Sequence, residues 1–117
     1  MIWSSIFLLT IITSHSWAKL HFSPNTLRPF LHEVRFVNLT SDCTLPKDTV
    51  IEIFPLPNDK AADIYPRQIT VKDSTQMIWS LEINIKGYGV TSFIANVKGN
   101  SKPDLSGSVQ VKVSHVY

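Results

Sequence analysis

One stretch in the first half of the chain has the residue types and spacing for covalent modification. Asn38-Leu39-Thr40 is an N-glycosylation sequon, because the residue between the asparagine and the threonine is not proline. No other asparagine has serine or threonine two positions later. We expect a glycan on Asn38 if its side chain points outward near a strand end. Such a glycan would also keep one face of a sheet free of protein contacts.

The sequence contains a single cysteine, Cys43, which cannot form an internal disulfide or a cysteine-based zinc site. In a secreted protein, an unpaired thiol indicates an intermolecular disulfide with a partner, or a partner cysteine in a further part of a longer chain. The alternative is a small buried side chain that packs like alanine. A catalytic thiol would need an activating histidine, and His32 is only a distant candidate across a predicted loop.

The other groups that could bind metal or catalyse a reaction are dispersed along the chain. His21, His32 and His115 do not share the spacing of a metal site with another ligand. The aspartates of the predicted loops stand singly, whereas calcium sites cluster their carboxylates. No Ser-His-Asp set, carboxylate pair or glycine-rich phosphate loop can be assembled. We therefore predict no catalytic, metal or cofactor site and no enzymatic activity.

A proline-rich loop over residues 55–66 is a candidate contact site. It includes Leu56 and Tyr65, and Arg67 follows it. Loops of this kind on a rigid scaffold are common binding sites. The alternative, which we favour, is a connection between two sheets in which Leu56 and Tyr65 cover the edge of the core. Tyr88, which stands between two glycines, is expected to be a turn aromatic rather than a ligand platform.

The first 18 residues form an apolar leader that differs in composition from the rest of the chain. All charged side chains lie from Lys19 onward. Residues 6–12 are apolar apart from Thr10, and Ser16 and Ala18 place small side chains at positions −3 and −1 of a cleavage site. The alternative is an uncleaved anchor, but a spanning helix needs about 20 apolar residues. We predict a signal peptide over 1–18, cleavage between Ala18 and Lys19, and one secreted or extracellular-facing domain over 19–117.

Composition and charge restrict the partners of this domain. The formal net charge of +2 is too small for a nucleic-acid-binding protein, in which a basic stripe is expected. No second apolar run has the length of a membrane span. We therefore expect an extracellular protein partner, with Cys43 as the candidate for a disulfide link to it.

The predicted elements are short β-strands. Apolar and polar residues alternate in 77–85 and again in 109–113, as in strands with one buried face. Turn-forming residues separate further segments rich in β-branched residues. We predict an all-β, antiparallel two-sheet sandwich of about seven strands, with 58–64 as loop. The remaining strands are expected at 19–23, 33–39, 49–54, 68–72 and 90–98, and the core is expected to contain Phe36, Ile51, Trp79, Leu81, Ile83, Phe93, Val109 and Val111.

The segments 79–85, 87–89, 90–99 and 105–113 resemble the later strands of immunoglobulin-like or fibronectin type III-like domains. This resemblance implies a β-sandwich that acts through protein contacts, in adhesion or recognition. The chain departs from true immunoglobulin domains because the paired cysteines are missing and Trp79 stands in a different strand. It is more remotely similar to the β-rich ectodomains of sodium/bile-acid-symporter-type transporters. The alternative function is therefore the N-terminal ectodomain of a truncated or partial membrane transporter of this type, or of a receptor.

Overall fold

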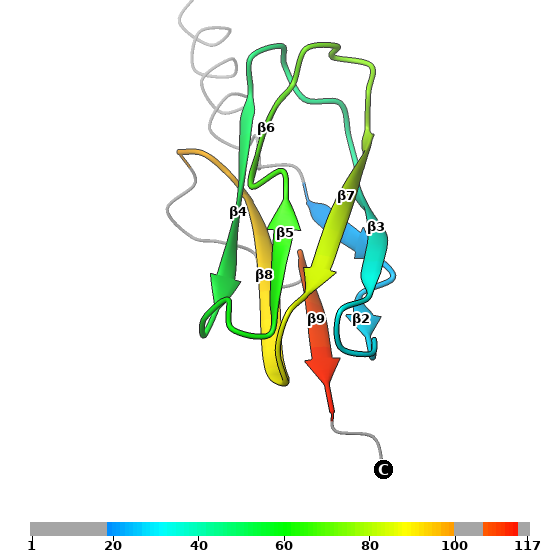
Figure 1. Cartoon of the computed structure of the whole chain (residues 1–117). Helices are drawn as coiled ribbons and strands as arrows, with labels where there is room; N and C mark the ends of the chain where they lie inside the picture. The colour runs from blue at the N-terminus through cyan, green and yellow to red at the C-terminus, as the bar shows by residue number, and fades with distance from the viewer. Residues whose placement is uncertain (1–18, 100–106, 115–117) are drawn as a thin grey trace, which may run out of the picture.

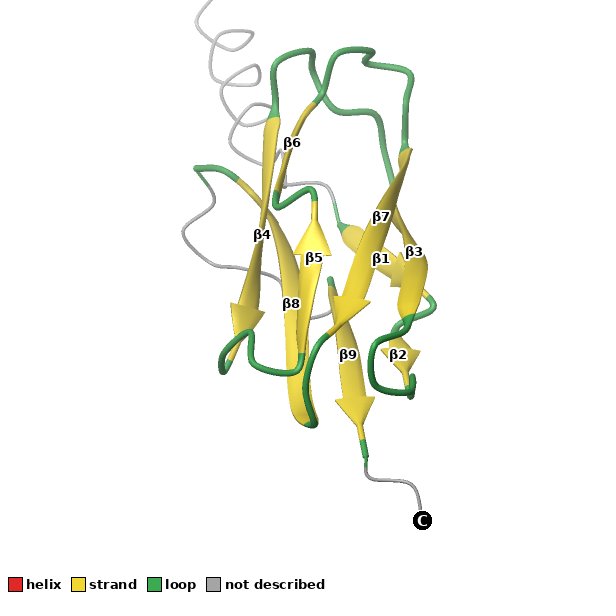
Figure 2. Cartoon of the chain, viewed as in Figure 1, coloured by secondary structure: helices red, strands yellow, loops and turns green. Residues whose placement is uncertain are grey.

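The protein folds into two β-sheets that lie face to face, as the computed structural model shows (Figures 1 and 2). The structure describes residues 19–99 and 107–114, and the predicted signal peptide lies outside them. Within these residues the first sheet has the order β1-β3-β7-β5 and the second has the order β2-β9-β8-β4-β6. The nine strands are β1 (Leu20–Ser23), β2 (Thr26–Leu27), β3 (Val34–Ser41), β4 (Val50–Leu56), β5 (Ala62–Tyr65), β6 (Gln68–Thr70), β7 (Ile78–Ile85), β8 (Gly89–Val97) and β9 (Ser108–Val113).

All seven predicted strand segments coincide with observed strands, which confirms the all-β, two-sheet architecture. The prediction of about seven strands omitted β2, and it omitted the parallel pairing of β2 with β9. Strand β2 lies between Pro24 and Pro29 and has only two residues, too few to show the alternation by which a strand is recognised in a sequence. Their partner in β9 determines their conformation, so the sandwich is not wholly antiparallel.

The expected loop over 58–64 is partly wrong, because Ala62 begins strand β5. Ala62 and Ile64 are buried, while the side chains between and after them are more exposed. The strand pairs antiparallel with β7 and ends before Pro66, which cannot donate a backbone hydrogen bond. The chain thus leaves the second sheet after β4, adds β5 to the first sheet, and returns to the second sheet with β6.

The core lies between the sheets and contains most of the residues predicted for it. Phe36 is the exception, since its side chain is 64% exposed. In β3 the core-facing positions are Val37 and Leu39, and the two-residue period of a strand puts Phe36 on the opposite face. Apolar residues occur on both faces of this strand, so its sequence does not determine which face is buried. The predicted core residues that are buried are Ile51, Trp79, Leu81, Ile83, Phe93, Val109 and Val111.

Candidate contact site

The connection between β2 and β3 contains a tight turn that we call the Phe30 turn, residues 30–33. The Glu33 carboxylate accepts a hydrogen bond from the backbone N–H of Phe30 at 2.6 Å, and the Glu33 N–H donates to the Phe30 carbonyl oxygen at 3.2 Å. The guanidinium of Arg35 donates to the same carboxylate, with Nε 2.7 Å from Oε2. One carboxylate therefore closes the turn and joins it to the first residues of β3.

The Phe30 turn is also attached to the end of β7. The N–H of His32 donates to the carbonyl oxygen of Ile85 at 3.1 Å, and the N–H of Ile85 donates to the carbonyl oxygen of Glu33 at 2.9 Å. His32 has a φ of 68°, in the left-handed region, which lets the chain reverse within the turn. The backbone around Phe30 is thus fixed by hydrogen bonds to Glu33 within the turn and by the hydrogen bonds of the turn to Ile85 of β7.

The electrostatics of the turn follow from the same contacts. The hydrogen bond from Arg35 is the largest cause that lowers the pKa of Glu33, and the Phe30 N–H adds to it. The hydrogen bond to Glu33 raises the pKa of Arg35. Glu33 is therefore ionised at neutral pH, and the turn keeps its carboxylate acceptor.

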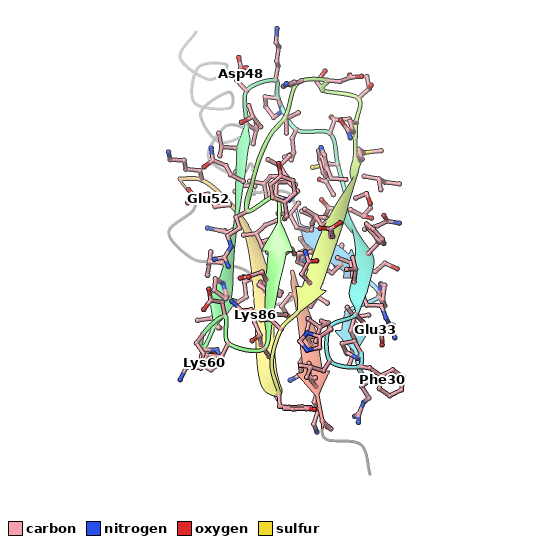
Figure 3. All side chains as sticks on the ribbon, viewed as in Figure 1. Phe30, Glu33, Asp48, Glu52, Lys60 and Lys86 are labelled. Atoms are coloured by element: carbon pink, nitrogen blue, oxygen red, sulfur yellow. The ribbon has the colours of Figure 1, made fainter. Side chains whose placement is uncertain are left out.

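The result is a large apolar ring held on the surface, 61% exposed, at the end of the sandwich where Figure 3 labels Phe30 and Glu33. The turn between β7 and β8 carries a second exposed aromatic side chain, Tyr88. Sequence reasoning did not identify Phe30. Its signal is the three-residue spacing between Phe30 and Glu33, which lets a carboxylate accept from a backbone N–H at the start of a turn.

The structure does not bring the predicted contact residues Leu56 and Tyr65 to one surface. Leu56 ends β4 and lies on the outer face of the second sheet, beside Ser92. Tyr65 ends β5, is 72% exposed, and lies on the outer face of the first sheet beside Glu82. The segment between them crosses from one sheet to the other.

Arg67, the third predicted contact residue, belongs to a network of ion pairs. Its guanidinium lies 2.9 Å from Asp63 and 3.4 Å from Asp59. Lys86 Nζ lies 3.1 Å from Asp63 and 4.0 Å from Asp59. These side chains are all 42–48% exposed, so each ion pair alone contributes little to the stability of the fold. The network joins the segment around β5 to the end of β7.

Asn38, the residue of the predicted glycosylation site, lies within β3 rather than near its end. Its side chain is exposed on the outer face of the first sheet. Its neighbours across the sheet are Ser23 of β1 and Ser80 of β7, and both are exposed. Small side chains on both sides leave room around the amide nitrogen of Asn38.

Cys43 is exposed, so the alternative of a buried small side chain is wrong. It follows the end of β3, whereas the Phe30 turn precedes the start of that strand. Ser41 Oγ donates to the carbonyl oxygen of Cys43 at 2.6 Å. Desolvation is the largest cause that raises the pKa of the Cys43 thiol, and a hydrogen bond with Asp42 raises it further. The intermolecular disulfide stays a prediction.

Within residues 19–99 and 107–114, no three histidine, cysteine, aspartate or glutamate side chains gather closely enough to hold a metal ion. His21 and His32 are exposed, while His115 lies outside the described residues, as does Ala18 of the predicted cleavage site. No helix in the described part of the chain is long and apolar enough to cross a membrane.

Comparison with known proteins does not assign the chain to a family. Neither the models of known protein families nor the sequences of curated proteins give a match. Function is therefore inferred from the surfaces described above.

Proposed function

We propose that the chain is a secreted or extracellular-facing β-sandwich module, immunoglobulin-like in plan and without enzymatic activity, that acts by contacting another protein. The observation that carries the proposal is the Phe30 turn, which holds an apolar ring 61% exposed. An aromatic side chain on a backbone fixed before binding is a favourable contact residue, because little conformational entropy is lost when a partner packs against it. Function thus depends on a surface rather than on a pocket.

The strand order supports the immunoglobulin-like plan. In that plan one sheet contains strands A, B, E and D, and the other contains G, F and C. The order β1-β3-β7-β5 corresponds to the first set, and β9-β8-β4 corresponds to the second. The chain departs from the plan after β4, because it adds β5 to the first sheet before it adds β6 to the second.

The extracellular location is supported by the sequence of residues 1–18, which has an apolar run and small residues at the expected cleavage positions. Secretion also makes the sequon at Asn38 accessible to the glycosylation machinery.

The test uses the full 117-residue chain expressed in secretory cells, with the product collected from the medium and labelled with a fluorophore. We expect saturable binding to cells of the organism that encodes it. Phe30→Ala should weaken this binding about tenfold or more, as expected for a central aromatic contact. Tyr65→Ala removes an aromatic ring that is 72% exposed, from the outer face of the first sheet, and serves as the matched control. Retention of the protein inside the cell, or unchanged binding by Phe30→Ala, would contradict the proposal.

A further inference from the structure

The outer face of the first sheet carries exposed apolar side chains that the Phe30 turn does not account for. Phe36 in β3 is 64% exposed, and Val34 in the same strand is 48% exposed. Phe36 lies in register with Glu82 of β7, and Glu82 lies in register with Tyr65 of β5. Two aromatic rings therefore flank one carboxylate across three adjacent strands.

The predicted glycosylation site lies on this same face, beside Phe36. Phe36 and Asn38 are two residues apart in β3, so both side chains point away from the core. A strand rises about 3.3 Å per residue, which places the two Cα atoms roughly 7 Å apart. A sugar on the Asn38 amide nitrogen is therefore within reach of the Phe36 ring.

Two large apolar side chains lie near Asn38 on this face, Phe36 and Ile78; Ile78 stands opposite Thr40 in β7 and is 57% exposed. Ser23 and Ser80 flank Asn38 across the sheet, and Thr40 of the sequon follows it on the same face. These short hydroxyl side chains offer space but little apolar area. Phe36 offers a large exposed ring whose electron-rich face attracts the C–H groups of a pyranose.

We propose that Asn38 carries an N-linked glycan whose first N-acetylglucosamine packs against the ring of Phe36. The bond formed joins the Asn38 amide nitrogen to C1 of the sugar. The glycan is transferred from a lipid-linked donor in the secretory pathway. A lipid pyrophosphate leaves from C1, and the amide nitrogen releases a proton. The glycan covers the outer face of β1-β3-β7-β5, and protein contacts are left to the end of the sandwich that carries Phe30. The inference rests on the proposed extracellular location.

The test uses the full chain secreted from cells that make only high-mannose glycans. Endoglycosidase H trims these glycans to one N-acetylglucosamine, which is the sugar proposed to contact Phe36. The N38Q variant supplies the protein without a glycan. Trimmed and glycan-free proteins are compared by urea denaturation with Phe36 in place and with Phe36→Ala.

With Phe36 in place, the single sugar should increase the equilibrium constant for folding by about twofold to tenfold, the range expected of a specific aromatic contact. The increase should disappear in Phe36→Ala. It should persist in Val90→Ala, which shortens an exposed apolar side chain on the other sheet. In the NMR spectrum, ring current from Phe36 should shift protons of the sugar upfield, and Phe36→Ala should abolish the shift.

The outcomes separate this inference from the proposed function. A secreted protein without a glycan at Asn38, or a sugar whose effect is equal with and without Phe36, would overturn the inference while leaving secretion and the role of Phe30 intact. Failure of the chain to reach the medium would instead contradict the proposed function on which the inference rests.

Discussion

The backbone nitrogen of Lys19 lies 2.9 Å from Oδ1 of Asp42, and the N–H of Asp42 donates to the carbonyl oxygen of Lys19 at 3.0 Å. These two hydrogen bonds join the residue before β1 to the residue after β3. Lys19 is also the first residue after the predicted cleavage site. In a cleaved chain, the same nitrogen is therefore a positively charged α-amino group beside a carboxylate.

Asp42→Asn in the secreted protein tests this relationship. The substitution keeps a hydrogen-bond acceptor but removes the charge, so the free energy of unfolding should fall by about 0.5 kcal/mol at pH 6.5. The positive α-amino group favours the folded state, and it loses its proton as the pH rises. At pH 10 the difference between the two proteins should thus fall to zero or change sign, because the Asp42 carboxylate also disfavours the Cys43 thiolate that forms at this pH. Urea denaturation at both pH values measures it.

Asp48→Asn is the matched control, because Asp48 is an exposed aspartate in the same connection between β3 and β4, and asparagine tolerates its positive φ of 71°. It should lack the pH-dependent difference. If Asp42→Asn loses as much stability at pH 10 as at pH 6.5, hydrogen-bond geometry rather than charge is responsible.

The pKa of Glu33 makes the Phe30 turn sensitive to acid. The hydrogen bonds from Arg35 and from the Phe30 N–H hold this pKa below its ordinary value of 4.5. A carboxylate with a lowered pKa contributes stability at pH values above 4.5 and loses the contribution as the pH falls through its folded value. The amide proton of Phe30, followed by NMR, should therefore titrate with a midpoint below 4.5.

Arg35→Gln should move that midpoint up toward 4.5, since it removes the largest cause of the shift. Asp73 provides an internal control, because hydrogen bonds from Thr75 lower its pKa in a separate turn. The amide of Thr75 should titrate identically in both proteins. A Phe30 midpoint unaffected by Arg35→Gln would show that Arg35 does not hold the carboxylate.

Alternation of apolar and polar residues identifies the buried face in some strands and not in others. In β7, apolar residues occupy every second position from Trp79 to Ile85, so the strand and its buried face both follow from the pattern. In β3, Phe36 and Val37 are both apolar, and tertiary pairing decides which is buried. The Phe30 turn depends on one hydrogen-bonding carboxylate and one positive φ at His32, and neither leaves a periodic signal.

Phe36 and Phe93 differ in burial, since Phe36 is exposed on the outer face of the first sheet and Phe93 is fully buried. In the N38Q background, which removes any glycan, Phe36→Ala should change the free energy of unfolding by less than about 0.5 kcal/mol, as for other surface substitutions. Phe93→Ala creates a cavity between the sheets and should lower it by about 3–5 kcal/mol. Urea denaturation of the two variants measures both values, and comparable losses would place Phe36 in the core after all.

Asp42 also affects the reactivity of Cys43, because its carboxylate helps to raise the pKa of the thiol. The thiolate is the reactive form, so a raised pKa slows alkylation at neutral pH. Asp42→Asn should increase the rate of iodoacetamide labelling at pH 7.5 by about twofold to fivefold. Desolvation, the larger cause, is unchanged by the substitution, so the rate should stay below that of a free cysteine peptide. An unchanged rate would exclude the contribution of Asp42.

Gly87 connects the segment before β5 to the turn after β7 by close backbone contact. A Cβ atom at this position would lie 2.6 Å from the carbonyl oxygen of Lys60, a backbone atom that cannot rotate away. The N–H groups of Lys86 and Gly87 donate to the carbonyl oxygen of Ala61 at 2.9 and 3.2 Å. Gly87→Ala must therefore push the two segments apart and should lower the free energy of unfolding by about 1–3 kcal/mol.

Gly89→Ala distinguishes this steric effect from backbone strain. No atom lies within 4 Å of a Cβ at Gly89, but its φ of 122° disfavours alanine. Both variants should be less stable than wild type. Only Gly87→Ala should speed hydrogen exchange at the amides of Lys86 and Gly87 beyond the global loss of stability, because only it displaces Ala61 from them. Equal exchange at these amides in variants of equal stability would show that the contact with Lys60 is not what holds the two segments together.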